Sequence, residues 1–366
     1  MEAIASATLG LHAARQPSPY ATVAARASDP AIALTLFTPH SRTRLLTVRC
    51  MRKTLHTLPL DLAAAAHSAT VRFRERDALR AITNADLSRT ALSTATTALV
   101  DLLGHDGPLP HRAIETRLTD AGIAISTTRL ALKLAWERGA VAYLNQGRGW
   151  NKEIRTFALT SHAYPDLNTE LPVDAATEQL FTAYLDRYGP VSLRDATWWS
   201  GLSQNILIDA WQRSSVKLVE LLTPWTDSPL YMSATRFAAF TTAPDADCTT
   251  GMVFLAHEDV ALKAYFQTRR RYLNDVPAAT AFNQIGEVLP TIIADGHVIG
   301  TWSWDQTVSR VQHHLVAHQA TAGQRHQINA AAATLTNTLR AGWHSISAPR
   351  RRSAGSPERH VTALLA

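Results

Sequence analysis

Residues 91–160 carry a pattern of three short helices followed by two strands, which constrains the fold more than any other part of the sequence. TALVDLLGHDG is an apolar helical run that ends at a glycine, and PLPHRAIETRLTDAG predicts a second helix. Ser126 and Thr127 are N-cap candidates for a third helix over STTRLALKLAWERGA, which Gly139 closes. AVAYL and IRTFAL then predict two strands joined by a glycine-bearing loop. We expect this segment to fold as one small unit.

The same order of elements returns at residues 175–223. ATEQLFTAYLDRYGP predicts a helix that ends at Gly189, and Ser192 with Asp195 three residues later has the spacing of a capping box. NILIDAWQR predicts a third helix and VKLVELL a strand. Three helices followed by strands form the winged-helix plan, whose third helix can enter a major groove. Such a unit can equally serve as a packing or dimerisation module, because a fold does not imply a function.

Predicted strands predominate from residue 229 onward. LYMSATRFAAF, GMVFLAH, PTIIADGHVIGTWSW and SRVQHHLVAH predict strands, DGHVIG predicts a tight hairpin, and INAAAATLTNTLRAGW predicts a final helix. We therefore expect an α+β protein with tandem winged-helix domains followed by a C-terminal β-barrel-like domain. The expected units are a first winged-helix-like domain at 1–90, winged helices at 91–168 and 174–228, the strand-rich domain at 229–345, and a basic disordered tail at 346–366.

Positive charge is concentrated between residues 41 and 80, where nine Arg and Lys residues face three acids, an excess as large as the +6 of the whole chain. A cluster of this kind attracts phosphate backbones and releases counterions on binding. The alternative is a solvated helix face over VRFRERDALRAI, in which two acids lie among the arginines. A second basic run at 349–360, PRRRSAGSPERH, predicts a disordered tail that adds only non-specific affinity.

Several classes of protein are excluded by the sequence. Cys50 and Cys248 lie too far apart for a CxxC-type zinc site or a disulfide framework. No window approaches the roughly 18 uninterrupted apolar residues of a membrane span, and no targeting signal is visible. GxSxG, HExxH and P-loop motifs are absent from the chain. With 46% hydrophobic and 18% charged residues, the composition is that of a globular protein. The two distant cysteines predict a protein of the reducing cytoplasm, and we expect no metal site.

Four segments carry a resemblance to a known family. They are GLHAARQPSPY at 10–20, VRCMRKTLHTLP at 48–59, FLAHEDVALKAYFQTRRRYL, and the hairpin DGHVIGTW at 295–302. In this order they resemble the winged-helix DNA glycosylases of the AlkZ and YcaQ type. The resemblance implies a monofunctional DNA glycosylase that excises bulky N7- or N3-alkylated purines from double-stranded DNA, in DNA repair or in self-resistance to genotoxic natural products. It also implies a nucleoid-associated monomer that uses no cofactor.

The resemblance assigns the chemistry to a short N-terminal motif, Gln-apolar-Gln or Gln-apolar-Asp, of which a His-apolar variant occurs. The matching stretch is Leu11-His12-Ala13-Ala14, so His12 falls on the first catalytic position. Ala14 falls on the second, where family members carry a polar group that helps hold the water. A neutral imidazole can accept a proton from that water. Gln16 is an auxiliary candidate for the same water, or a cap for a helix ending near Pro17. Relatives usually carry a helix before this motif, so we expect an N-terminally short first domain.

Other residues are candidates for contact with the duplex. Arg129 and Lys133 share one face of the predicted third helix, and Arg148 with Trp150 is a candidate hairpin tip that probes the groove. Arg49, Arg52 and His56 lie in VRCMRKTLH, and a strand there would place Arg52, Thr54 and His56 on one face. We interpret Arg52 as a phosphate contact and His56 as either a core or a DNA-binding residue. The resemblance adds further residues that contact the duplex or brace the C-terminal domain: Asp259, Lys263, Arg269 and Arg270. Trp302 and Trp304 are expected to fill the barrel.

The alternative function is that of a non-catalytic winged-helix DNA-binding protein, either a regulator or a protein that sequesters damaged DNA. Ala14 at the second motif position favours it, because alanine cannot hold a water. Strand breaks at an N7-alkylated site after alkali treatment would distinguish the two functions.

Overall fold

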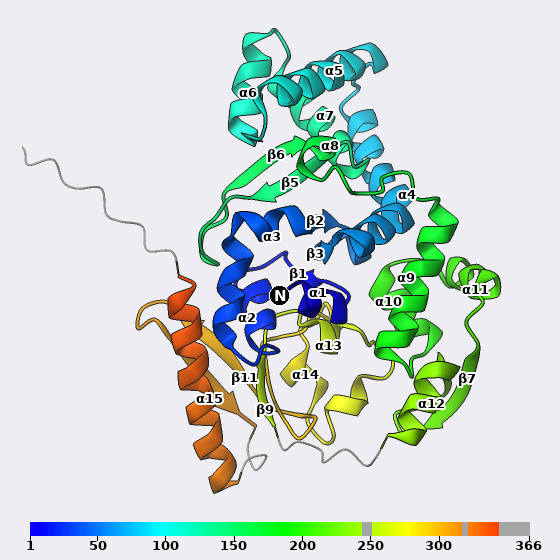
Figure 1. The fold of residues 1–366 in the computed structure, drawn as a ribbon, viewed down its shortest axis with the longest axis vertical. Helices are drawn as coiled ribbons and strands as arrows, with labels where there is room; N and C mark the ends of the chain where they lie inside the picture. The colour runs from blue at the N-terminus through cyan, green and yellow to red at the C-terminus, as the bar shows by residue number, and fades with distance from the viewer. Residues whose placement is uncertain (244–250, 317–320, 344–366) are drawn as a thin grey trace, which may run out of the picture.

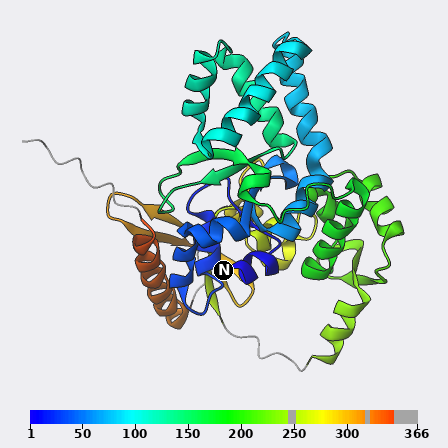
Figure 2. The same cartoon turned by 45° about the horizontal axis from the view of Figure 1, so that its top comes forward.

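The computed structural model describes residues 1–243, 251–316 and 321–343, and it mixes helices with antiparallel sheets, as an α+β protein should. Residues 89–137 form one end of the molecule, whereas residues 173–213 and the C-terminal helix flank opposite sides of the N-terminal segment (Figures 1 and 2). The predicted tail at 346–366, the basic run at 349–360 and Cys248 lie outside the described residues. None of the described helices is long and apolar enough to span a bilayer.

The N-terminal part builds three strands and packs one long helix against them. Its elements are α1 (Glu2–Ala7), β1 (Leu11–His12), α2 (Ser18–Ala24), η1 (Pro30–Phe37), α3 (Pro39–Arg44), β2 (Leu45–Arg49), η2 (Met51–Lys53), β3 (Leu55–Pro59) and α4 (Leu60–Asn84). Strand β3 lies between β1 and β2, and the register places His12 directly opposite His56. The single strand expected over VRCMRKTLH is wrong, because the chain turns back at η2, where Arg52 and Lys53 have φ values of +51° and +60°.

The middle unit contains the three helices and the hairpin that were predicted at 91–160. They are α5 (Arg89–Asp106), β4 (Leu109–Pro110), α6 (His111–Asp120), α7 (Ile125–Glu137), β5 (Val141–Asn145) and β6 (Arg155–Leu159), followed by α8 (Thr160–Ala163). Leu99, Ile114 and Leu132 bury the facing sides of the helices. Strand β5 also pairs with β2, so one six-stranded sheet, β1-β3-β2-β5-β6-β4, continues across the expected boundary at residue 90.

The third unit follows the predicted order as well. It consists of α9 (Val173–Tyr188), α10 (Leu193–Ser200), α11 (Gln204–Arg213), β7 (Leu218–Thr223) and β8 (Thr226–Ser233). The capping box is confirmed, since the Ser192 hydroxyl accepts from the Asp195 amide and Asp195 accepts from the Ser192 amide. The strand expected over LYMSATRFAAF is wrong after Ser233, whose hydroxyl caps a helix, α12 (Ala234–Thr242), by accepting from the Arg236 amide.

The C-terminal sheet has the strand order β12-β11-β10-β9. Its elements are β9 (Met252–Leu255), α13 (Val260–Lys263), η3 (Arg269–Tyr272), α14 (Ala278–Ala281), β10 (Thr291–Ala294), β11 (His297–Asp305), β12 (Arg310–Leu315) and the covering helix α15 (Ala322–Ala341). The predicted Asp-Gly hairpin is confirmed, with φ of +50° at Asp295 and +81° at Gly296. Strands β9 and β12 are opposite edges and do not pair, so the described strands form an open sheet rather than the expected barrel.

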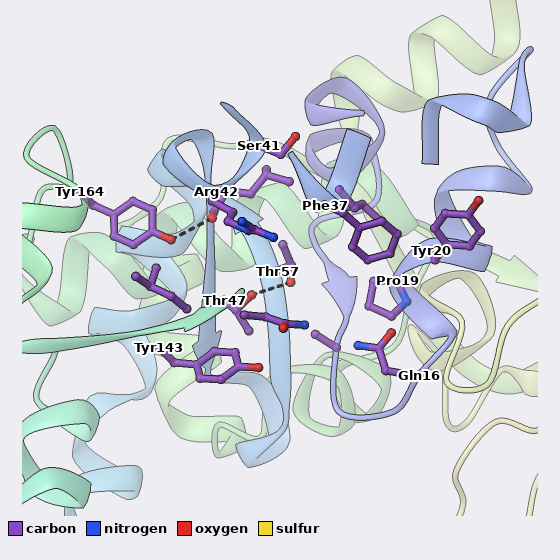
Figure 3. A pocket seen from close by; sticks show the side chains of 15 residues that line it. Gln16, Pro19, Tyr20, Phe37, Ser41, Arg42, Thr47, Thr57, Tyr143 and Tyr164 are labelled. Carbon is purple, nitrogen blue, oxygen red and sulfur yellow. Dashed lines mark hydrogen bonds between the residues drawn. The ribbon is translucent and has the colours of Figure 1, made fainter. Parts of the chain in front are cut away.

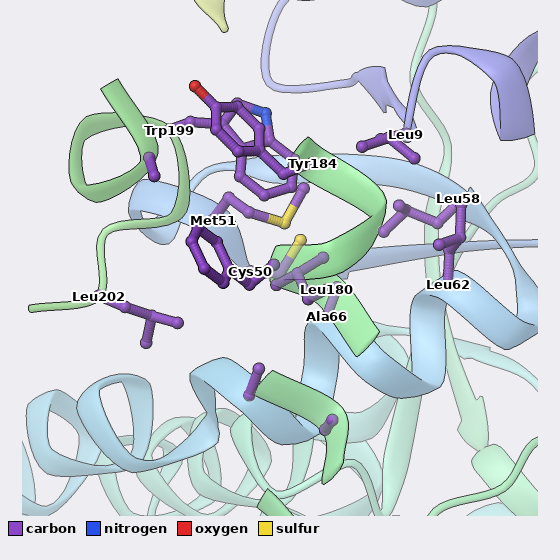
Figure 4. Close-up of a cluster of buried hydrophobic side chains, with 14 of the residues drawn as sticks. Leu9, Cys50, Met51, Leu58, Leu62, Ala66, Leu180, Tyr184, Trp199 and Leu202 are labelled. Carbon is purple, nitrogen blue, oxygen red and sulfur yellow. The ribbon is translucent and has the colours of Figure 1, made fainter. Parts of the chain in front are cut away.

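A shared core joins the first and third units. Leu62 and Ala66 of α4 pack with Leu180 and Tyr184 of α9, and Leu58 of β3 closes the same cluster (Figure 4). Burial of such apolar side chains contributes about 1.5–3 kcal/mol each. The helix α4 is therefore held from two sides, which fixes the strand β3 that precedes it.

Charged side chains also lie inside this part of the fold. The expectation of a solvated arginine face on α4 is wrong at Arg74, which is buried and donates from Nη1 to Glu137 Oε2 of α7 at 2.8 Å. Arg49, expected at the DNA, also pairs with Glu137 and lies 3.5 Å from Asp77. Two arginines of the basic segment, Arg49 of β2 and Arg74 of α4, therefore form ion pairs that join these elements to Glu137 of α7.

Replacing Asp195 by alanine should lower the free energy of unfolding by at least about 3 kcal/mol, because buried donors would lose their acceptor. The Asp195 carboxylate accepts from the amides of Ser192, Phe266 and Gln267 and from the Thr268 hydroxyl. Urea unfolding of the variant measures the loss. The control Asp209→Ala, at an exposed position of α11, should change stability by less than about 0.5 kcal/mol. Equal effects of the two substitutions would contradict this role.

Candidate active site

His12 lies in a short strand at the centre of the molecule, and only 3% of its side chain is exposed. Its ring stands nearly perpendicular to that of His56, with centroids 5.5 Å apart, and 6.5 Å from the ring of His257. Within the described part of the chain, neither ring nitrogen of His12 has a hydrogen-bond partner. A buried imidazole with two free nitrogens is unusual, because buried polar atoms are normally hydrogen-bonded.

A carboxylate from the C-terminal domain faces this imidazole. Glu258 follows β9 with a φ of +55°, and its Oε2 atom lies 3.9 Å from His12 Nε2. The Val288 amide donates to Oε1 at 2.7 Å, and the Lys263 ammonium lies 3.0 Å from Oε2. Arg52 Nη1 is 3.9 Å from the same oxygen. These cations and the amide fix the carboxylate beside the histidine.

Lys263 has a structural partner on each side. Its ammonium donates to the Thr54 hydroxyl at 3.2 Å, besides pairing with Glu258, and its side chain is 2% exposed. A residue so buried braces α13 against the turn before β3, so the structure favours the bracing role over a duplex contact for Lys263. His56 is buried as well, and its Nδ1 lies 3.1 Å from the Thr54 carbonyl, which places His56 in the core.

Burial sets the charge states of this cluster. Burial first, and then the charge of Lys263, hold the pKa of His12 far below its usual value near 6.5. Burial also lowers the pKa of Lys263 to about 8, although Glu258 opposes the shift. Burial alone would raise the pKa of Glu258, but Lys263 and the Val288 amide lower it. At neutral pH the site therefore holds a neutral imidazole beside an ionised carboxylate.

His257, the residue before Glu258, is linked to two further charged side chains. His257 Nε2 lies 3.7 Å from Glu287 Oε2, and the largely exposed Arg15 approaches that oxygen at 3.3 Å. Such an exposed ion pair contributes only about 0–1 kcal/mol. The pair of Arg15 and Glu287 beside His257 is therefore weak.

Arg52 and Arg269 stack on one aromatic ring beside the cluster. The guanidinium carbons lie 3.7 Å and 5.0 Å from the centroid of Trp198. Arg269 also donates to the Gly286 carbonyl at 3.0 Å. The left-handed turn at Arg52 thus brings its side chain to Glu258 and Trp198, although no continuous strand joins it to His56.

Gln16 lies apart from His12. It is exposed and lines a small cavity with Ala13, Thr47, Thr57 and Tyr143 (Figure 3). Ala13 and Thr57 are the strand neighbours of His12 and His56, so this cavity lies on the opposite face of the sheet. The expectation that Gln16 serves the same water does not fit this position. The capping role is wrong too, because α1 ends at Ala7 and α2 begins at Ser18.

Trp150 does not form an exposed hairpin tip. Only 4% of it is exposed, its indole donates to the Leu339 carbonyl at 2.8 Å, and its ring packs against Trp304 and Trp343. The loop between β5 and β6 thus docks on α15, which contradicts a groove-probing role for Trp150. Trp302 is buried as expected and donates to the Leu255 carbonyl at 2.8 Å.

The remaining predicted contacts lie at or near the surface. Arg148 and Arg270 are exposed, Lys133 is half-buried, and Arg129 is exposed and donates to Glu115 at 2.6 Å. They come from different elements and do not gather around His12. Within the described ranges, no group of three His, Cys, Asp or Glu side chains is arranged to hold a metal ion.

Sequence reasoning missed Glu258 and named its neighbour Asp259 instead. Asp259 is buried and pairs with Arg26 at 2.6 Å, which ties α13 to α2. The only available signal was the His-Glu-Asp run inside the segment that resembles the family. Which of its acids faces His12 depends on the left-handed backbone at Glu258.

Acid should destabilise this protein below about pH 6.5 through its buried histidines. Burial holds the pKa values of His12 and His56 below those of the unfolded chain, so on acidification only the unfolded chain takes up protons there. Each should account for about 1 kcal/mol of stability lost between pH 7 and about pH 5.5. The urea unfolding midpoints of the wild type and of His56→Gln, measured at both pH values, test this. A pH dependence as large in His56→Gln as in the wild type would contradict it. The control is His162→Gln, at an exposed position, which should keep the wild-type pH dependence.

Two comparisons with known proteins point to the same family. A family model described as DNA glycosylase AlkZ-like matches residues 5–338. Among solved structures, the chain is similar to the Streptomyces sahachiroi DNA glycosylase AlkZ, with a TM-score of 0.70 and 17% identity over 92% of this chain and 91% of that chain. At that identity the likeness shows the fold alone. A search of curated proteins gave no match. Because the family model covers most of its length, the chain belongs to the AlkZ-like DNA glycosylase family.

Proposed function

We propose that this protein is a monofunctional DNA glycosylase that hydrolyses the N-glycosidic bond of bulky N7- or N3-alkylated purines in double-stranded DNA. It would act as a monomer at the nucleoid, in DNA repair or in self-resistance to genotoxic natural products. Membership of the glycosylase family supports the reaction class. The observation that carries the site is the neutral His12 imidazole, with both nitrogens free, beside the ionised Glu258.

The substrate chemistry suits such a site. A purine alkylated at N7 or N3 is already cationic, so it leaves as a neutral base and needs no general acid. The protein must stabilise an oxocarbenium-like sugar and present a water to C1′. His12 would accept the proton of that water at its one unprotonated ring nitrogen, because neither ring nitrogen is engaged in a hydrogen bond.

Because only 3% of the His12 side chain is exposed, access to it would require neighbouring side chains to move. The nearby ring of His257 is linked to Glu287, which also pairs with Arg15. The Arg15 pair is exposed and weak, so a DNA phosphate could replace Glu287 as the partner of Arg15. Binding of the duplex would then open the path to the imidazole.

The helical units supply the proposed duplex contacts. We infer that the middle and third units are winged helices, with α7 as the groove-binding helix of the middle unit. Arg129 and Lys133 lie on α7, and Arg148 is exposed in the loop between β5 and β6. These positions supply positive charge away from the catalytic cluster.

The substitution His12→Ala should slow base release at least about 100-fold while leaving duplex binding intact, because proton transfer by a positioned group contributes about 10²–10⁴. The assay incubates the protein with a duplex bearing one N7-mustard-alkylated guanine, adds alkali and quantifies strand breaks. His162→Ala, at an exposed position of α8, is the matched control and should keep the wild-type rate. Unchanged release by His12→Ala would refute the role of His12.

Arg129→Ala and Lys133→Ala should each weaken duplex binding and reduce the slope of log affinity against log salt by about one. Both effects arise because each side chain would release counterions when it meets a phosphate. Fluorescence anisotropy across a salt series measures the slope. Arg340→Ala, an exposed position on α15, should leave it unchanged. A slope that stays at the wild-type value would place α7 away from the duplex.

A non-catalytic DNA-binding protein is the second candidate function. It is favoured by Ala14 at the second motif position and by the small exposure of His12. Binding of the alkylated duplex without alkali-labile breaks would support it over the glycosylase.

A further inference from the structure

By the resemblance described above, His12 lacks the second polar group that is expected at position 14, where this chain has alanine. Ala14 is exposed whereas His12 is buried. A single imidazole holds a water by one hydrogen bond, which leaves the orientation of that water free. The site therefore requires a second group if it is to aim the water at C1′.

Glu258 occupies the place where such a group would act. The 3.9 Å between His12 Nε2 and Glu258 Oε2 is too long for a direct hydrogen bond. One water at about 2.8 Å from each atom would bridge them, as ordered waters commonly bridge polar groups. Glu258 Oε1 is fixed by the Val288 amide, so Oε2 is the oxygen that remains for His12 and the cations.

The backbone of Glu258 points to the same conclusion. Its φ of +55° is unusual for a residue with a side chain, and such conformations concentrate at functional sites. This conformation turns Glu258 toward His12 while the next residue, Asp259, pairs with Arg26. Glu258 and His12 come from segments more than two hundred residues apart, which only the folded chain brings together.

Resting on the proposed function, we infer that Glu258 is the second water-holding group of this glycosylase and replaces the polar residue missing at Ala14. The C1′–N bond breaks and its electron pair leaves with the neutral alkylated base. The water held by His12 and Glu258 then forms the C1′–O bond, and its proton passes to His12 Nε2. The Glu258 charge stabilises the cationic sugar on the way.

A single and a double variant distinguish a water-holding role of Glu258 from a role in which it only pairs with Lys263. Glu258→Leu removes both carboxylate oxygens, so this side chain can no longer hold a water, and it leaves the Lys263 ammonium without its ionic partner. The double substitution Glu258→Leu/Lys263→Met removes both charges. Glu75→Leu, which breaks a surface ion pair with Arg138, is the matched control. The measured quantities are single-turnover base release from the N7-mustard-alkylated duplex, affinity for that duplex, and thermal unfolding.

We expect release at least about 100-fold below wild type in both Glu258 variants, with wild-type affinity, and with thermal stability restored in the double variant. Wild-type release by the double variant, or by Glu258→Leu, would overturn the inference while leaving the glycosylase assignment intact. If the wild-type protein itself releases no base while it binds the duplex, the proposed function fails, and the inference fails with it.

Discussion

The buried pair of Glu258 and Lys263 is the interaction on which the centre of this structure depends. It joins the segment after β9 to α13, and through Thr54 it reaches the turn before β3. Removing one partner of such a pair leaves an uncompensated buried charge, which typically costs about 3–5 kcal/mol. The same pair fixes the carboxylate opposite His12. Stability and the proposed chemistry are thus coupled in one cluster.

The larger units are arranged so that this cluster is enclosed. The shared core of α4 and α9 holds β3, and Asp195 ties the start of α10 to residues 266–268, just after α13. Arg26 and Asp259 connect α2 to α13 on the other side. Each of these links spans segments far apart in sequence. The resulting burial accounts for the lowered pKa values of His12 and His56.

Local patterns predicted most of the secondary structure. The helices α5, α6 and α7, the capping box at Ser192 and the Asp-Gly turn all follow from short-range signals. The errors occurred where packing decided the outcome. Trp150 was expected in solvent but docks on α15, and Arg74 was expected on a solvated face but pairs with Glu137 inside the protein. Both partners are distant in sequence and invisible to a local pattern.

The sequence by itself determined the family resemblance, the order of the helical units and the position of His12 in the N-terminal motif. It could do so because helix periodicity, caps and turns are local properties of the chain. Only the tertiary structure decided that Glu258, rather than Asp259 or Gln16, faces the imidazole. The physical reason is that side-chain direction in the site depends on a left-handed backbone at Glu258 and on strand alternation at β1, both fixed by long-range packing.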